Sequence, residues 1–116
     1  MHRYQVRVGL AALAAGLLLG HGSASAASAE HGKVAFMQHG CWQCHGTQGQ
    51  GAGTGPKLAP DPLPFDTLAS FVRTTSRRMP PFSEKILSDA DLADIYAYLQ
   101  SIPKPPDPKT ISQLNQ

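Results

Sequence analysis

Apolar residues group in two segments that are predicted to be helices, and in the second they recur at the three- and four-residue spacing of an amphipathic helix. The first runs over about Glu30–His39, and the following Gly40 is a residue type that commonly ends helices. The second runs over about Phe65–Arg73. The expected buried residues are Val34 and Ala35 with Phe36 or Met37 in the first segment, and Phe65, Leu68, Ala69 and Val72 in the second.

A third helix is marked at both of its ends. Ser88 is a natural N-cap, and Asp91 stands three residues later in the capping-box position. Leu87 and Leu92 have the spacing of a hydrophobic staple across this start. Pro103 stops the helix because proline cannot continue the backbone hydrogen bonding. The expected inner face comprises Leu92, Ile95, Tyr96, Leu99 and Ile102.

The segments between and after these helices are predicted to be loops. Gly46–Pro64 and Thr75–Leu87 are rich in glycine or proline, and no run alternates apolar and polar residues at period two. The pattern therefore predicts an all-α domain over residues 30–102. Four prolines within Pro103–Gln116 predict an extended, loosely held C-terminal tail over residues 103–116.

The N-terminus has the three parts of a secretory signal peptide. Met1–Arg7 carries two arginines, Val8–Gly20 is almost entirely Ala, Leu and Gly, and A-x-A patterns end at Ala26 and at Ala29. The apolar run is shorter than the ~20 residues that a membrane span needs. We expect residues 1–29 to be removed on export to the periplasm, leaving no stable membrane span. Cleavage after Ala29 is favoured, and cleavage after Ala26 is the alternative. The rival interpretation of the whole segment is an uncleaved membrane anchor.

Removing the signal changes the charge of the chain. The net charge of +2 comes from Arg3 and Arg7, so the segment from Glu30 onward carries eight basic and eight acidic side chains. This balance gives no basic face for nucleic acid, and none is expected as a partner. A domain of this size buries only about 60% of its unfolded surface, and its two cysteines are too close together for a disulfide to constrain much chain. A bound ligand is therefore expected to complete the core.

The strongest chemical signal is the C-x-x-C-H run from Cys41 through Cys44 to His45. Two thiols three positions apart reach the two vinyl groups on one edge of a haem, and the next residue then falls beneath the iron as a ligand. The spacing predicts one covalent haem c, attached through Cys41 and Cys44 with His45 as the proximal ligand.

Other interpretations of the cysteine pair need further partners. A thioredoxin-like pair requires a βαβ context, which the pattern does not predict. A structural zinc site requires four ligands, and neither His31 nor His39 forms a second pair at zinc-like spacing. A plain disulfide leaves His45 without a role.

Met79 is the candidate for the sixth iron ligand. It precedes Pro80 and Pro81, which restrict the backbone and let a loop be held stiffly without forming a helix. The alternative interpretation is that Met79 fills a gap in the core, as methionine usually does. Met37 and His39 lie just before Cys41, on the proximal side, and are poorly placed to reach the opposite face.

From about Glu30 to Ile102 the sequence resembles the class I cytochrome c family. The resemblance rests on the order of helix, haem motif, Gly/Pro loop, helix, methionine loop and C-terminal helix. It implies the cytochrome c fold, three to four short helices wrapped around one covalent haem. Further implied features are a contact of Gly32 and Phe36 with Ile95 and Tyr98, a hydrogen bond from His45 Nδ1 to the Pro56 carbonyl, and a haem-lining Leu58 within Gly55–Leu58.

Several other side chains are candidates for the rim of the haem edge. Trp42, Lys57, Arg77 and Arg78 are the possible partner contacts, and Arg73, Arg77 or Arg78 is a possible partner of the haem propionates. The plain alternative for each charged residue is a solvated surface position.

His/Met ligation predicts an electron carrier and not an enzyme, because both axial positions of the iron are filled. The expected partners are redox proteins, a dehydrogenase or a terminal oxidase, met either as a free shuttle or as the haem subunit of an exported dehydrogenase. The alternative is a haem enzyme or a gas or redox sensor in which Met79 is displaceable. No distal histidine and arginine pair suited to acid–base chemistry is evident.

Overall fold

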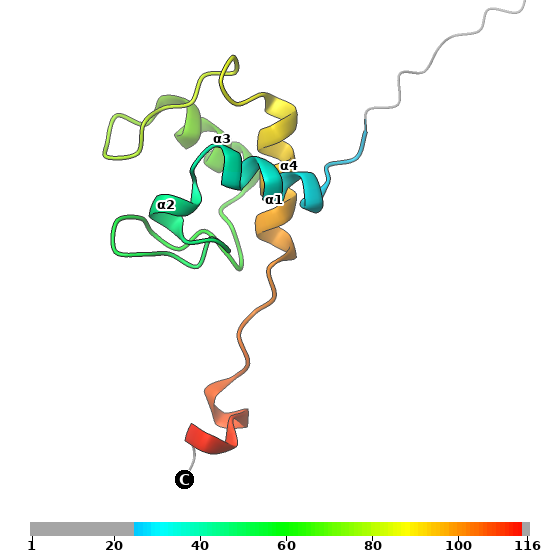
Figure 1. Ribbon diagram of the computed structural model, residues 1–116, viewed down its shortest axis with the longest axis vertical. Coiled ribbons are helices and arrows are strands. Elements are labelled where there is room, and N and C mark those ends of the chain that lie inside the picture. The colour runs from blue at the N-terminus through cyan, green and yellow to red at the C-terminus, as the bar shows by residue number, and fades with distance from the viewer. Residues whose placement is uncertain (1–24, 115–116) are drawn as a thin grey trace, which may run out of the picture.

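The computed structural model describes residues 25–114, so nearly all of the predicted signal peptide lies outside the described residues. The described chain is helical and contains no β-strand, which confirms the all-α prediction (Figure 1). Its elements are α1 (Ala29–Gln38), α2 (Trp42–His45), α3 (Phe65–Thr74), α4 (Asp89–Ser101) and the 3₁₀ turns η1 (Pro108–Thr110) and η2 (Ser112–Leu114).

Helices α1 and α4 form the centre of the domain. Gly32 lies so close to α4 that a Cβ at this position would overlap the Asp94 carbonyl oxygen and lie 2.8 Å from the Ile95 nitrogen. One turn later, the ring of Phe36 packs edge-on against Tyr98 at a centroid distance of 5.6 Å, and Phe36 is fully buried. The helix contact implied by the cytochrome c resemblance is therefore present.

The buried face of α1 differs in part from the prediction. Ala35 and Phe36 are buried, but Val34 is 51% exposed and Met37 is 38% exposed. The reason is that α1 meets α4 through Gly32, Ala35 and Phe36, which share one face at i, i+3 and i+4. Val34 lies two residues from Gly32 and so points away from this contact.

Helix α4 begins as the sequence predicts. The Ser88 hydroxyl accepts a hydrogen bond from the Asp91 backbone nitrogen at 3.0 Å and donates one to the Asp91 carboxylate at 2.8 Å. Leu87 and Leu92, the predicted staple, are each only 2% exposed. Ile95 and Leu99 of the predicted inner face are also buried, whereas the predicted Tyr96 and Ile102 are half-buried and Tyr98 takes a core position.

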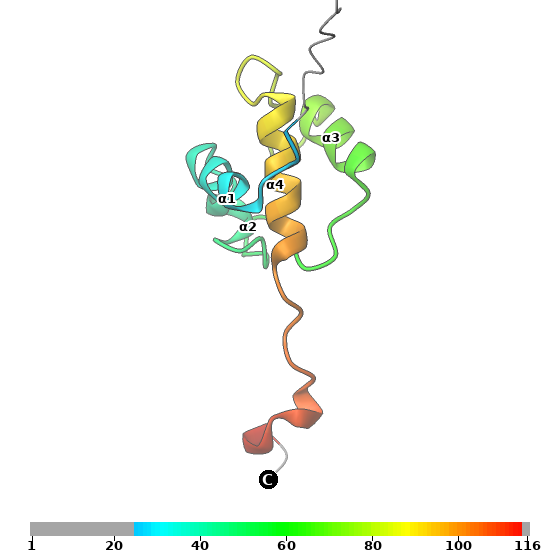
Figure 2. The same cartoon turned by 90° about the vertical axis from the view of Figure 1, so that its right-hand side faces the viewer.

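Helix α3 packs on the opposite side of α4 from α1 and α2, as Figure 2 shows. Its Leu68 and Val72 are buried, and Phe65 lies edge-on against Tyr96 at a centroid distance of 5.2 Å. Phe65 and Ala69 border the core and are half-buried. The amphipathic stripe read from the sequence therefore faces the core in α3.

The C-terminal tail leaves α4 at Pro103 but is not extended throughout. It contains η1 and η2, seen at the red end of the chain in Figure 1. The Asp107 carboxylate accepts a hydrogen bond from the Lys109 nitrogen at 2.9 Å, and Pro108 opens η1 with a backbone suited to a first turn. No helix among the described residues is long and apolar enough to cross a membrane.

Candidate functional site

A glycine turn joins α1 to the C-x-x-C-H run. Gly40 has a φ of +74°, its nitrogen donates to the Met37 carbonyl at 3.2 Å, and the Cys41 nitrogen donates to the Phe36 carbonyl at 3.1 Å. These two bonds form a Schellman motif, which requires a left-handed residue where Gly40 stands. The C-x-x-C-H run therefore begins directly after α1, the helix that packs against α4.

The motif itself folds as a single helical turn. The His45 nitrogen donates to the Cys41 carbonyl at 3.0 Å, so Cys41 stands at the start of α2 and Cys44 and His45 lie within it. Cys41 is half-buried, Cys44 is exposed, and no disulfide joins them. Burial raises the pKa of the Cys41 thiol to about 11, which keeps it protonated at neutral pH.

The imidazole of His45 is buried and held in one orientation. Its Nδ1 donates a hydrogen bond to the Pro56 carbonyl oxygen at 2.8 Å. Within residues 25–114, His45 Nε2 makes no hydrogen bond, so the lone pair of this nitrogen is available to a metal. Gly55 makes the arrangement possible, since a Cβ there would lie 2.5 Å from the Cys44 carbonyl oxygen and 3.0 Å from His45 Nδ1.

The loop after the C-x-x-C-H run is closed by hydrogen bonds within itself and is joined to α4 by one side chain. The Gly49 carbonyl accepts hydrogen bonds from the Leu58 nitrogen at 2.7 Å and the Ala59 nitrogen at 2.9 Å. The Tyr98 hydroxyl donates to the Thr47 carbonyl at 2.8 Å, and burial raises the pKa of this phenol. Leu58, the predicted haem-lining residue, is half-buried at the border of the core.

The methionine loop between α3 and α4 lies beside the segment that leads into the motif. Met79 is half-buried against the hydrophobic core. Three residues later, Phe82 meets the ring of His39 edge-on at a centroid distance of 6.4 Å, and His39 stands two residues before Cys41. The fold thus brings the Met79 loop next to the entry of the C-x-x-C-H turn, although they are far apart in sequence.

The donor set fits a c-type haem. Two thiols on one helical turn and an adjacent imidazole with an available Nε2 are what covalent haem attachment requires. The zinc interpretation lacks ligands, since no group of three or more His, Cys, Asp or Glu side chains in the described part of the chain is arranged to hold a metal ion.

Among the candidate rim residues, Trp42, Lys57, Arg77 and Arg78 are exposed. Arg73 is held by the protein instead, through bonds from its guanidinium to the Phe82 and Leu87 carbonyls and to Asp89. No sequence motif marks this role, because two of the partners of Arg73 are backbone carbonyls, which any residue type can provide.

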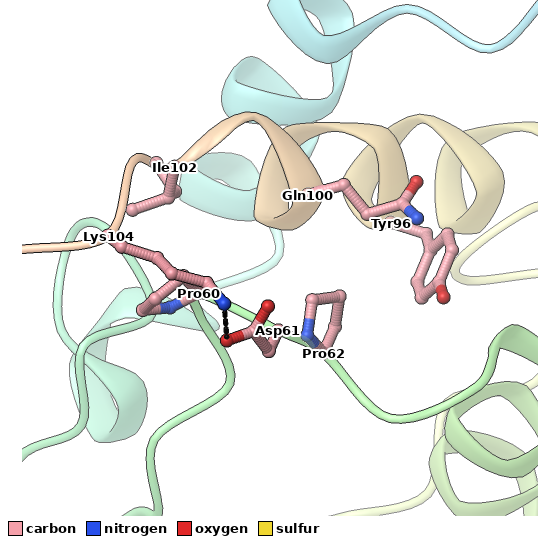
Figure 3. Close-up of a pocket in the computed structure, with 7 residues that line it drawn as sticks. All are labelled: Pro60, Asp61, Pro62, Tyr96, Gln100, Ile102 and Lys104. Atoms are coloured by element: carbon pink, nitrogen blue, oxygen red, sulfur yellow. Dashed lines mark ion pairs between the residues drawn. The ribbon is translucent and has the colours of Figure 1, made fainter.

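A surface pocket of about 490 Å³ lies elsewhere, where the chain around Pro60–Pro62 faces the end of α4 (Figure 3). Lys104 pairs with Asp61 across its edge at 3.0 Å, but both side chains are about 70% exposed and such pairs stabilise weakly. None of the predicted haem-site residues lines this pocket.

Comparisons with known proteins agree with this geometry. The family described as cytochrome C oxidase, cbb3-type, subunit III matches residues 27–99, which include the first helix, the C-x-x-C-H turn and most of α4. The chain is 32% identical over 90 residues to the cytochrome c subunit of 4-cresol dehydrogenase (hydroxylating) from Pseudomonas putida, covering 78% of this chain and 77% of that protein. No solved structure gives a significant match. The match over most of the helical domain and the haem-type donor set lead to one conclusion: the chain belongs to this family of c-type cytochromes and is an electron-transfer haem protein.

Proposed function

We propose that the protein is an exported monohaem cytochrome c with His45 and Met79 as its axial ligands and with thioether bonds at Cys41 and Cys44. The observation that carries this proposal is the turn α2, where a locked imidazole with an available Nε2 stands next to both thiols. Burial of His45 and its bond to the Pro56 carbonyl keep the ring from rotating, so the ligand is preorganised.

The haem supplies reversible one-electron chemistry when it is bound. The chain supplies the rest: Met79 closes the second axial position, and its thioether favours a relatively high reduction potential. A closed second position leaves no site for a substrate, which suits a carrier and not a haem enzyme.

The axial ligands are tested by absorption spectroscopy of the oxidised protein. Ligation by Met79 predicts a weak far-red band that disappears in Met79→Ala and persists in Met37→Ala, a matched control in which the methionine is an exposed residue of α1. A wild-type protein that lacks the band and binds carbon monoxide readily would instead be a haem enzyme or a sensor with a displaceable ligand.

Covalent attachment is tested by staining for haem after denaturing electrophoresis. The wild-type band should stain, because thioether bonds survive denaturation, and the double variant Cys41→Ala/Cys44→Ala should be colourless. Pyridine haemochrome absorbance per mole of protein should give one haem per chain. An unstained wild-type band would contradict the haem c assignment.

A dehydrogenase is the proposed redox partner, with the protein as its haem subunit. The support is the relative that is named as the cytochrome c subunit of a dehydrogenase. Trp42 lies inside the C-x-x-C-H run and is 41% exposed, so it is placed to meet a partner next to the haem attachment site. Purification of the native protein from its source should recover a stable dehydrogenase complex, and elution as a lone monomer at all salt concentrations would support a free shuttle.

Export to the periplasm is proposed from the charged, apolar and small-residue parts of the N-terminus. The two candidate cleavage sites differ in which contacts of the folded domain they would keep. The Ser28 hydroxyl caps α1 by accepting from the His31 nitrogen at 3.2 Å, and the Ser28 nitrogen donates to the Asp94 carboxylate at 2.6 Å. Cleavage after Ala29 would remove both bonds, whereas cleavage after Ala26 keeps them. We therefore propose Ala26 in place of the site favoured by sequence alone.

Intact mass of the holoprotein from the periplasmic fraction tests both statements. A chain beginning at Ala27 supports them, one beginning at Glu30 contradicts only the choice of site, and a full-length chain contradicts export with cleavage.

A further inference from the structure

The loop that carries Met79 has few backbone bonds of its own. Pro80 and Pro81 have no N–H to donate, and the loop between α3 and α4 contains no helix or strand, only one turn closed by bonds from the Ile86 and Leu87 nitrogens to the Ser83 carbonyl. Its backbone is tied to α3 by the Phe82 nitrogen, which donates to the Val72 carbonyl at 2.9 Å. Proline stiffness limits how the loop bends, but it does not decide where the loop sits against the rest of the domain.

One side chain of α3 holds this loop at two further places. Arg73 Nη1 donates to the Phe82 carbonyl at 2.9 Å and to the Leu87 carbonyl at 2.8 Å. Arg73 Nη2 donates to the Asp89 carboxylate at 2.7 Å. The Arg73 side chain is only 18% exposed, so most of its surface is enclosed by the loop and the neighbouring helices.

The two carbonyl bonds of Arg73 hold the loop, and its ion pair with Asp89 orients the guanidinium group. Bonds from a charged donor to two carbonyls in a poorly hydrated position are stronger than ordinary backbone bonds. The Asp89 carboxylate is 77% exposed, so its ion pair contributes little attraction, but it fixes the direction of the planar guanidinium. Together the contacts join α3, the loop on the C-terminal side of Met79, and the first turn of α4.

We propose that Arg73 is a positioning residue that holds the Met79 loop in the place from which the thioether ligates iron. This proposal rests on the proposed Met79 ligation. Three of the five guanidinium N–H groups of Arg73 are used within the protein, which leaves two for the predicted propionate contact.

The test is competition at the iron of the oxidised holoprotein by exogenous imidazole, which binds only when Met79 is displaced. A loosened loop raises the fraction of chains in which the thioether is off the iron, so the apparent affinity for imidazole rises with that fraction. Arg73→Ala should bind imidazole at least about tenfold more tightly than wild type, because the loss of a single charged hydrogen bond already corresponds to about that factor. Arg73→Lys should lie between the two, since an ammonium keeps the charge but cannot bridge both carbonyls in the same plane.

Lys85→Ala is the matched control, because Lys85 is an exposed cationic residue of the same loop. Its imidazole affinity should equal that of wild type. Far-UV circular dichroism without denaturant confirms that each compared variant is folded. Asp89→Asn removes only the orienting charge, so it provides a milder variant if Arg73→Ala does not fold, and its affinity should rise in the same direction as that of Arg73→Lys.

The outcomes separate this proposal from the one on which it rests. A wild-type protein without the far-red methionine band contradicts Met79 ligation itself. A wild-type band together with unchanged imidazole affinity in Arg73→Lys and Asp89→Asn overturns the role of Arg73 and leaves the ligation intact. An equal rise in Lys85→Ala would overturn it as well, because the effect would then belong to any cationic residue of the loop.

Discussion

The contact between α1 and α4 at Gly32 makes a quantitative prediction for Gly32→Ala. A Cβ at this position would overlap the Asp94 carbonyl oxygen and lie 2.8 Å from the Ile95 nitrogen. Both obstacles are backbone atoms, so no side-chain rotation relieves them and the two helices must move apart. Overpacking of this kind costs about 1–3 kcal/mol.

Separation of the helices also loosens the ring contact of Phe36 with Tyr98, an edge-on pair at 5.6 Å. Such pairs contribute about 0.5–1.5 kcal/mol beyond the area that they bury. Replacing glycine by alanine within a helix returns about 1 kcal/mol of backbone propensity. We therefore expect Gly32→Ala to lower the free energy of unfolding by about 2 kcal/mol, the balance of these three effects.

Denaturant unfolding of the holoprotein, followed by far-UV circular dichroism, measures this loss. Gly53→Ala is the control, because a Cβ at Gly53 has nothing within 4 Å and the residue lies in a loop. The control should unfold close to wild type. If Gly32→Ala were as stable as Gly53→Ala, the close approach at Gly32 would not be what sets the helix separation, and the reasoning would be refuted.

Three further predictions concern single side chains, each measured by the same unfolding experiment. Phe36→Ala empties a fully buried position and should cost about 3–5 kcal/mol, and a loss below 1 kcal/mol would place Phe36 outside the core. Ser88→Ala removes the N-cap of α4 and should cost about 1 kcal/mol, with Ser88→Asp largely preserving stability. Burial raises the pKa of Tyr98 above its ordinary 10.0, so the unfolded chain ionises first and stability falls as the pH rises past that value. Tyr98→Phe should reduce this alkaline loss, and an unchanged pH profile would contradict the assignment.

Local signals in the sequence predicted the helix boundaries well. Ser88 and Asp91 cap α4 as expected, and α4 ends at Ser101, just before Pro103. Gly40 ends α1 in the left-handed conformation that glycine adopts most readily. These features depend on hydrogen bonds within a few residues, so the neighbouring sequence contains all the information needed.

Periodicity was less informative about which face of a helix is buried. It indicated the correct side of α3, but in α1 it included Val34, which is exposed, and allowed Met37 in place of Phe36. A short helix with apolar residues on several sides has more than one plausible face. The buried face of α1 is the one that contains Gly32, because the absence of a side chain there lets α4 approach closely.

Some features of the candidate site could likewise be predicted from local sequence, and others could not. The spacing of Cys41, Cys44 and His45 by itself determined the donor set, because thiols and imidazole on one helical turn are a local arrangement. The bond from His45 to Pro56 followed only from family resemblance, and the structure shows it at 2.8 Å. The contacts of Arg73 had no sequence signal, since its partners are carbonyls that any residue type can provide.

Local patterns in the sequence were enough to place the three longer helices, the Ser88 cap of α4, the Gly40 end of α1 and the chemistry of the C-x-x-C-H turn. Contacts between distant segments were needed to show that Gly32 sets the closeness of α1 and α4 and that Ser28 belongs to the folded domain through Asp94. The bonds of Arg73 to carbonyls of the Met79 loop likewise became visible only in the folded chain. The difference comes from the range of the interactions. Capping and motif spacing act within one turn of the chain, whereas packing and side chain-to-carbonyl bonds depend on which distant segments the fold brings together.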